Sequence, residues 1–580
     1  MMSMLSLASH ISKFMIISAS VVISFLPMLI PFCCGAREYR LCFVGLIVIC
    51  AILLAYVLVN RNVISYRFDI KDLSIAAYLI AGLLNMAFTA QSFPEPLWFC
   101  RWGAVVVAYL SGRIIFKKKK NLLYLFLSVS GAVESLIAIL QYMGLFKVSL
   151  NGYFPHSGSF QTPGALGVFV ALAIICNVYL IYCFVKIKKR LVASLLGLCL
   201  AVSVAGLVVS DSRTAMIALI VAALIYFARV LEKRRLKLRY LFYLVTAVLM
   251  VFAVVAIYIK RPDSVKTRML LWKVALTMNR DNVVTGNGVS SFSRDYMPCQ
   301  EAYFRGNLSS EYALFANNHY QSYNAFLQIY VEQGVVGIII ITFLLGLFLK
   351  RSRKDKPPFY LLIGWFTASC FLYISDIPPF MVLIGVFMGI AEPKNRADNK
   401  DMTNSKPVPR GSNKVVNVGL ATFLTGCIIL GAIHLNRYNS AYNSIGSSTQ
   451  NSLYNKNMHF AALTAKSAFN SDCLNIEDKI SIMKARMQRF STSEMLIDLG
   501  DLYLSANRYM EAEESYIRAF YMVPCRIIPL YKLFLLYQGI GNEQKAADIA
   551  KRIVALKASV VSSLTIQLKQ EAAKYLLPDK

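Results

Sequence analysis

The chain has 580 residues, of which 57% are hydrophobic and only 16% are charged, and its formal net charge is +30 at pH 7. Soluble globular proteins carry about 25% charged residues, so this composition excludes an ordinary soluble enzyme and favours a chain that folds in lipid. The positive charge does not indicate a nucleic-acid partner, because the lysines and arginines are divided among short segments between apolar runs.

Apolar runs that are long enough to cross a bilayer recur along the first three quarters of the chain. A transmembrane helix needs roughly 20 apolar residues. We expect about thirteen such helices, near residues 12–33, 41–59, 72–90, 97–116, 121–145, 164–185, 191–210, 214–229, 239–259, 334–349, 358–377, 379–392 and 415–435. The predicted fold is therefore all-α, with a polytopic membrane domain over residues 1–435.

Five basic clusters fix the expected orientation of these helices. They occupy Lys117–Lys120, Lys186–Arg190, Arg229–Arg239, Lys350–Lys356 and Lys394–Lys414. With an odd number of spans and a cytoplasmic N-terminus, every cluster falls on the cytoplasmic side, as the positive-inside rule requires. We therefore expect a multi-pass protein of the bacterial inner membrane, whose long loop (residues 260–333) and C-terminal tail (residues 436–580) are periplasmic.

Polar residues stand out at two places among the early spans. Glu134 and Gln141 lie within one predicted helix, where a carboxylate is costly, and we expect Glu134 to neutralise a nearby arginine. The Ser210–Arg213 turn joins two apolar helices and places Arg213 at the start of the second one. A guanidinium there offers paired donors for a diphosphate, although an arginine at this depth also occurs simply as an anchor to lipid headgroups.

The long loop contains four short motifs in a fixed order. R-M-L-L-W-K begins at Arg268, G-N-G-V-S-S-F begins at Gly286, N-H-Y-Q-S-Y-N begins at Asn318, and E-Q-G-V-V-G begins at Glu332. Each motif alone has little meaning, because a lone G-x-G is a turn and a lone histidine is more often structural than catalytic. Their order and their predicted common side of the membrane are the informative features.

The C-terminal tail carries an amphipathic helical repeat. Small and aromatic residues follow the tetratricopeptide (TPR) pattern, which has a period of about 34 residues, and we expect Leu499, Gly500, Tyr503, Ala512, Tyr516, Ala519 and Pro524 to pack its helix pair. A second, weaker unit is expected over residues 527–557. Such a tail either braces the membrane domain or recruits a protein partner, and the sequence leaves both roles open.

Taken together, these motifs resemble the O-antigen ligase and O-antigen polymerase family of membrane glycosyltransferases. The resemblance covers residues 120–345, from a G-S-F segment at Gly158 to the E-Q-G-V-V-G motif. It implies a GT-C-like membrane fold that transfers a glycan from a polyprenyl-diphosphate carrier to an acceptor hydroxyl, without a metal or another cofactor. The acceptor is a growing glycan, the lipid A core or a protein, and membrane lipids surround the site.

The resemblance also suggests roles for individual residues. Arg213 and Arg268 are expected to bind the departing diphosphate, since cations stabilise such a leaving group. Counted back from Gly334, Tyr323 occupies the position at which the family has its histidine, directly before Asn324. Since tyrosine is a poor base, we expect His319 to act as the base, which a helix would place on the same face as Tyr323. Otherwise Tyr323 and Asn324 position the acceptor, or His319 only caps the loop.

Two other classes of protein are compatible with this sequence. A polysaccharide flippase or other transporter would place its polar residues near the middle of the bilayer, often within internal repeats. A non-catalytic scaffold of polysaccharide assembly would use the tail to recruit its partners. Replacing Arg213 or His319 distinguishes them from an enzyme, which would lose glycan transfer while still folding.

Overall fold

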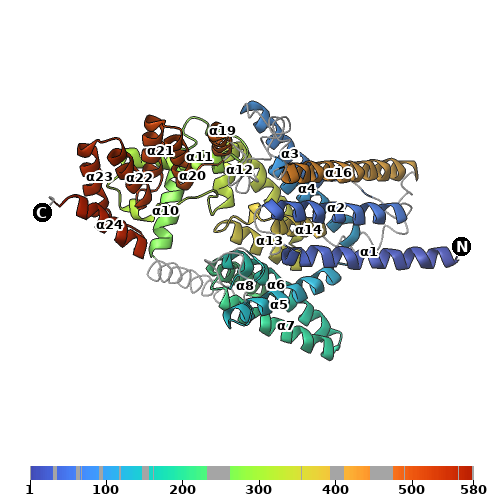
Figure 1. The fold of residues 1–580 in the computed structure, drawn as a ribbon. Coiled ribbons are helices and arrows are strands. Elements are labelled where there is room, and N and C mark those ends of the chain that lie inside the picture. Colours follow the sequence, from blue (N-terminus) through green and yellow to red (C-terminus); the bar gives the residue numbers. More distant parts are fainter. Residues whose placement is uncertain are drawn as a thin grey trace.

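The structure is a computed structural model. It describes residues 2–29, 36–60, 66, 68–89, 96–116, 119–146, 156–160, 162–231, 262–353, 356–391, 410–444, 475–488, 490–559 and 561–577. Within these ranges the regular elements are all helices, as the sequence predicts. The apolar helices gather on one side and the helices of the long loop and the C-terminal tail on the other (Figure 1).

Six of the described helices are long and apolar enough, by length and composition, to cross a membrane. They are α3 (Ile70–Phe88), α5 (Lys120–Tyr142), α6 (Pro163–Lys186), α7 (Arg190–Val209), α8 (Arg213–Leu231) and α12 (Ala325–Ser352). Further apolar segments lie in α1 (Met2–Leu29), α2 (Ala36–Val59), α14 (Pro378–Ile390) and α16 (Arg410–Ser444). The chain is thus a polytopic helical membrane protein. The predicted span at 239–259 falls outside the described residues.

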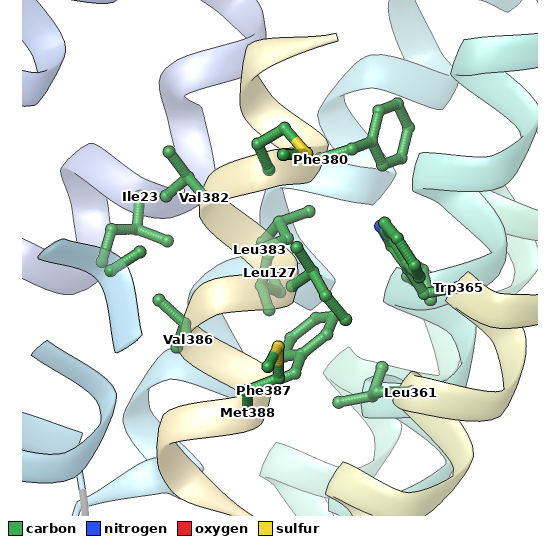
Figure 2. Packing of buried hydrophobic residues seen from close by; sticks show 14 of the residues in the cluster. Ile23, Leu127, Leu361, Trp365, Phe380, Val382, Leu383, Val386, Phe387 and Met388 are labelled. Carbon is green, nitrogen blue, oxygen red and sulfur yellow. The ribbon is translucent and has the colours of Figure 1, made fainter. Parts of the chain in front are cut away.

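The short helix α14 packs in the middle of this membrane body. Its Phe380, Val386 and Phe387 are completely buried, and they meet side chains of α13 (Lys356–Ser369), α5 and α1 (Figure 2). Its glycines let α4 (Pro96–Ser111) approach closely: a Cβ at Gly389 would lie 2.3 Å from the carbonyl oxygen of Tyr109. Small residues serve this purpose in membrane helices, where close packing replaces the hydrophobic effect.

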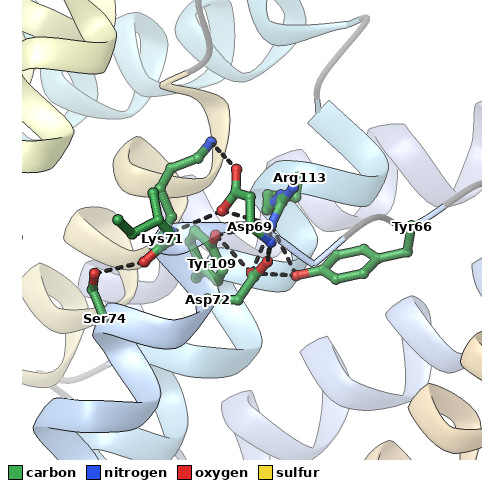
Figure 3. A network of polar contacts seen from close by, with 8 residues as sticks. Tyr66, Asp69, Lys71, Asp72, Ser74, Tyr109 and Arg113 are labelled. Carbon is green, nitrogen blue, oxygen red and sulfur yellow. Dashed lines mark hydrogen bonds and ion pairs between the residues drawn. The ribbon is translucent and has the colours of Figure 1, made fainter.

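A network of charged and phenolic groups ties the start of α3 to the end of α4. Arg113, in the π-helical turn η1 (Gly112–Phe116), donates from Nη1 to both carboxylate oxygens of Asp72 at 2.6 Å (Figure 3). The hydroxyl of Tyr109 donates to the same carboxylate at 2.9 Å, and Lys71 pairs with Asp69 at 3.6 Å. Lys71 is only 1% exposed. Two cations therefore face two carboxylates, and their charges balance.

The long loop is largely helical. It contains α10 (Pro262–Thr277), α11 (Ser291–Gly306) and the 3-10 turn η2 (Glu311–Phe315), and it returns to the membrane body through α12. α12 bends at Gly334, whose φ of 65° lies in the left-handed region. The bend separates a short first segment of α12, which belongs to the loop, from the membrane-crossing remainder.

The C-terminal tail folds as consecutive packed helices. They are α19 (Ile476–Met487), α20 (Ser493–Ser505), α21 (Tyr509–Met522), α22 (Ile528–Gly539), α23 (Glu543–Ala555) and α24 (Ser563–Tyr575). The packing residues expected from the repeat are all buried. Gly500 faces the ring of Tyr516, where an added Cβ would lie only 2.4 Å from a ring carbon. The assignment of these helices to the TPR class stays a prediction.

Candidate functional site

Arg213 lies at the first turn of α8, directly after the tight turn that follows α7. The hydroxyl of Ser212 donates to the carbonyl oxygen of Gly164 at 3.3 Å, which joins this turn to the first residues of α6. α6 can come this close because it has Gly167 there; a Cβ at that position would lie 2.2 Å from the Cβ of Ser212. The half-buried Arg213 is thus held at the junction of two helix starts.

Arg268, on α10, lies close to Arg213 although 55 positions separate them in the sequence. Burial lowers the pKa of Arg268, Tyr323 opposes this shift, and the positive charge of Arg213 adds to it. Within the described ranges, neither guanidinium forms an ion pair with a carboxylate. Two cations that repel each other and have no carboxylate partner in the described ranges favour an anionic ligand with more than one charge.

Tyr323 links the arginine pair to the predicted base. The guanidinium carbon of Arg268 lies 5.8 Å from the centre of the Tyr323 ring, within the range of a cation–π contact. The ring of His319 lies 5.9 Å from that of Tyr323, and the ring of Tyr373 lies 5.3 Å from it on another side. Tyr323 itself has a φ of 53°, a conformation that non-glycine residues seldom adopt outside functional or tightly held positions.

His319 is buried between two tyrosine rings, at 7% exposure. The Tyr296 ring also lies 6.0 Å from the His319 ring, and the backbone N–H of His319 donates to the sulfur of Met297. Burial lowers the pKa of His319 to about 4, so the imidazole is uncharged at neutral pH. Its Nε2 has no hydrogen-bond partner within the described part of the chain. The structure thus brings His319, Tyr323 and both arginines together.

The segment from residue 316 to residue 324 is not helical, so the helical spacing expected for His319 and Tyr323 is wrong. The reason lies in local hydrogen bonds. The hydroxyl of Ser322 donates to the carbonyl oxygen of Asn324 at 2.5 Å, and Oδ1 of Asn324 accepts from the N–H groups of Phe326 and Leu327. Asn324 is therefore the N-cap of α12, a role in which asparagine is strongly preferred. The two rings meet through the turn rather than along a helix.

The two glycine motifs of the long loop interlock. The N–H groups of Asn287 and Gly288 donate to the carbonyl oxygens of Val331 and Glu332 at 2.9 and 3.0 Å. A Cβ at Gly334 would lie 2.2 Å from the carbonyl oxygen of Val284, so only glycine fits. The G-N-G turn is thus bonded to the bend of α12, which explains why the sequence carries both motifs.

Among the residues that the structure describes, no arginine pairs with Glu134, contrary to our expectation. Its carboxylate accepts from the hydroxyl and the N–H of Ser159, the latter at 3.0 Å. Gln141 forms two hydrogen bonds with the backbone of Gly158, at 2.9 and 3.0 Å. Both residues of α5 therefore hold the G-S-F segment that precedes α6. The Glu134 carboxylate thus accepts hydrogen bonds from two buried donors, the backbone N–H and the hydroxyl of Ser159. The spacing of residues in the sequence did not suggest this partner.

Comparison with known proteins relates part of this chain to a family. A family model described as O-antigen ligase matches residues 198–342. This stretch is similar to the O-antigen ligase domain. The match begins later than the region of resemblance expected from the motifs, but it includes Arg213, Arg268, His319 and Tyr323. A search among curated proteins finds no match.

The O-antigen ligase domain supports a function in glycan transfer during O-antigen or polysaccharide assembly. The sequence analysis did not predict the contacts of two further residues, Trp272 and Tyr373. Trp272 lies one helical turn after Arg268 on α10, and its indole N–H donates to the carbonyl oxygen of Ser322 at 3.1 Å. Through this bond α10 holds the turn that carries Tyr323. Spacing did hint at this, because Arg268 and Trp272 lie on one face of α10. Tyr373 lies outside the matched region, and no motif pointed to it.

Proposed function

We propose that this chain transfers a glycan from a polyprenyl-diphosphate carrier to an acceptor hydroxyl on the periplasmic side of the bacterial inner membrane. The observation that carries the proposal is the pair of neighbouring guanidinium groups, Arg213 and Arg268, without a carboxylate partner among the described residues. A diphosphate supplies the negative charges that this pair lacks, and its oxygens match the planar donors of arginine. The O-antigen ligase domain is consistent with such a donor.

The proposed reaction is a single displacement at the anomeric carbon of the glycan. The acceptor oxygen forms a new bond to this carbon, the bond to the diphosphate oxygen breaks, and the carrier diphosphate leaves with the electron pair. Arg213 and Arg268 stabilise the charge that develops on the leaving group. Interactions of this kind act on the transition state more than on the bound substrate, and so they raise the rate.

His319 is the group best suited to take the proton of the acceptor hydroxyl. Burial raises the pKa of Tyr323, although Arg268 opposes the shift, so the phenol stays protonated. The carboxamide of Asn324 is not basic, and its oxygen already caps α12. His319 is neutral at neutral pH and its Nε2 is available to accept a proton. Tyr323 then orders the acceptor side of the pocket beside Arg268.

The orientation of the chain follows from its charge distribution. All five basic clusters fall between spans on the side opposite the long loop, so the positive-inside rule directs the loop and the tail to the periplasm. The arginine pair then lies where a carrier that has crossed the membrane presents its diphosphate.

Reconstitution in lipid vesicles tests the proposal. The protein is supplied with a polyprenyl-diphosphate glycan and, in separate samples, with a glycan, a lipid A core or a serine-containing protein, and the products are measured by mass spectrometry. We expect one acceptor to gain the glycan and free carrier diphosphate to appear in equal amount. Absence of transfer to every acceptor by folded protein, or full transfer by the Arg213→Ala variant, would overturn the proposal.

A further inference from the structure

The C-terminal tail contacts the segment that carries the predicted base. Residues 316–320 run along the tail, and four of these five residues bond or pack against it. The carbonyl oxygen of Ala316 accepts from the thiol of Cys525 at 3.4 Å. The ring of Tyr320 lies 6.2 Å from that of Phe490. The ring contacts of His319 are instead with Tyr296 and Tyr323, which belong to the long loop.

Two asparagines form the strongest part of this contact. Oδ1 of Asn318 accepts from the N–H of Ser493 at 3.2 Å, at the start of α20, and its Nδ2 donates to the carboxylate of Glu494. Oδ1 of Asn317 accepts from Arg526 at 3.1 Å, and Arg526 also pairs with Glu494. The side chains on the N-terminal side of His319 are therefore anchored to α20 and to the turn before α22.

Gln300 of α11 reinforces the same contact from within. Its side chain is completely buried, and its amide nitrogen donates to the carbonyl oxygens of Asn317 and Met522, at 3.1 and 2.6 Å. Its oxygen accepts from the hydroxyl of Tyr296, whose ring contacts His319. One carboxamide thus connects the tail, the segment before His319 and the ring beside it. Such a buried and fully bonded group fixes geometry, because each lost bond leaves a buried polar atom without a partner.

The apolar contacts agree with the polar ones. Leu496, Ala519 and Met522 of the tail share a buried cluster with Leu270, Leu271 and Val274 of α10, the helix that carries Arg268. Two ion pairs join α11 to α21: Arg518 with Glu301, and Arg305 with Glu514, both at 3.2 Å. The tail is therefore packed against both helices of the long loop rather than held apart on a linker.

From this geometry we infer that the C-terminal tail is a built-in part of the transfer site. By holding residues 316–320, it sets the position of His319 and Tyr323 relative to Arg268. Asn317, Asn318, Gln300 and Glu494 are positioning residues: they act through the segment they hold and not on the substrate. The inference rests on the proposed function for its catalytic consequence, whereas the holding of the segment stands on the contacts alone.

The test compares Asn318→Ala with Tyr531→Phe in the full-length protein. The control removes the hydrogen bond that the Tyr531 hydroxyl donates to the carboxylate of Glu571 on α24, at 2.6 Å. This bond lies within the tail and does not involve residues 316–320. Hydrogen exchange of residues 316–324, followed by mass spectrometry, reports whether the segment is held. We expect Asn318→Ala to accelerate this exchange about tenfold and to lower kcat for glycan transfer by about tenfold, with the KM for the donor changed less than about twofold. Tyr531→Phe leaves all three values unchanged.

The outcomes separate the two proposals. Unchanged exchange in Asn318→Ala shows that the tail does not hold the segment and overturns the inference. Faster exchange with unchanged kcat shows that the held position does not matter for transfer, and overturns it as well. If the wild-type protein transfers no glycan, the proposed function is wrong, while the exchange measurement still decides whether the tail holds the segment. Gln300→Leu, with the thermal unfolding temperature measured alongside, is a second and independent disruption of the same contact.

Discussion

At the scale of single residues, the site depends on charge that the described part of the protein does not neutralise. Arg213 lies on α8 and Arg268 on α10, and the positive charge of Arg213 adds to the lowering of the Arg268 pKa that burial causes. An enzyme that binds a dianion or trianion gains from this unfavourable pairing, because the ligand relieves it. A structural arginine would instead be expected to have a carboxylate partner.

Replacing Arg268 with alanine should lower kcat/KM for the polyprenyl-diphosphate donor by about 100-fold or more, because one preorganised donor to the leaving group is lost. Arg268→Lys should recover only part of the loss, since lysine lacks the planar paired donors. Steady-state transfer assays at varied donor concentration measure both. Lys273→Ala is the matched control, because Lys273 is an exposed cation on the same helix. Equal losses in the Arg268 and Lys273 variants would remove Arg268 from the site.

The pH dependence of transfer should report His319. Its pKa is about 4 in the folded protein, below the usual 6.5, so the neutral base is present at neutral pH and disappears only as the pH falls through about 4. We expect kcat/KM to keep its neutral value well into the acid range and to fall near that pH. His319→Gln should lose most of the activity, and His156→Gln, in another loop, should not. An acid limb near the usual pKa of histidine would contradict the assignment.

At the scale of elements, the sequence predicted most helices because hydropathy reports directly on burial in lipid. The turn at Ser210–Arg213 was likewise predictable, since polar residues interrupt the apolar run there, whereas α12 begins at Ala325, before the span expected from residue 334. The conformation of residues 319–323 was not predictable. These residues could form either helical backbone hydrogen bonds or side-chain hydrogen bonds to the backbone. The side chains of Ser322 and Asn324 form the second kind, and the segment is therefore not helical.

Partners across the fold were harder still to predict. Glu134 lies in a span, and sequence reasoning assigned it an arginine because charge is the usual partner of a buried carboxylate. In the structure its carboxylate instead accepts hydrogen bonds from the backbone N–H and the hydroxyl of Ser159. Nothing in the spacing of α5 reveals this, because the contact depends on how the loop before α6 folds back.

The bend of α12 offers a test at this scale. Gly334→Ala should destabilise the protein by about 2–4 kcal/mol, because alanine is strained at a φ of 65° and its Cβ would overlap the Val284 carbonyl. Thermal unfolding in detergent measures the loss. Gly346→Ala, in the same helix, is the control: a Cβ there meets nothing within 4 Å, so stability should change by less than about 1 kcal/mol. Similar unfolding temperatures for the two variants would show that the interlock does not constrain the bend.

At the scale of the whole molecule, the membrane body and the proposed site are stabilised separately. The Arg113 network lies beyond the C-terminal end of α4, whereas Trp98 at the start of α4 shares a buried cluster with Val289 of the long loop, and the network shares no residue with the arginine pair. The proposed site is formed instead by Arg213 at the start of α8, Arg268 on α10 and the segment before α12, and the C-terminal tail packs against α10 and that segment. Stability and transfer should therefore respond to different substitutions.

Replacing Arg113 with alanine should cost about 3 kcal/mol of stability, because it leaves the carboxylates of Asp69 and Asp72 without their shared cation. We expect a lower unfolding temperature in detergent but an unchanged kcat per folded molecule below that temperature. Arg351→Ala, at the end of α12, removes a cation without disturbing the network and should leave the unfolding temperature unchanged. A loss of kcat in folded Arg113→Ala would link the network to the site.

The contact between Asn318 and Ser493 spans 175 positions of the sequence. The ribosome therefore makes the segment around His319 long before it makes the helix that anchors it, and in the proposed orientation that helix must also be carried across the bilayer before the two can meet. Long-range contacts of this kind form late in folding. If the proposed function and the role inferred for the tail hold, a prematurely terminated chain keeps both arginines but lacks the helix that anchors the segment before His319, and it should therefore transfer no glycan.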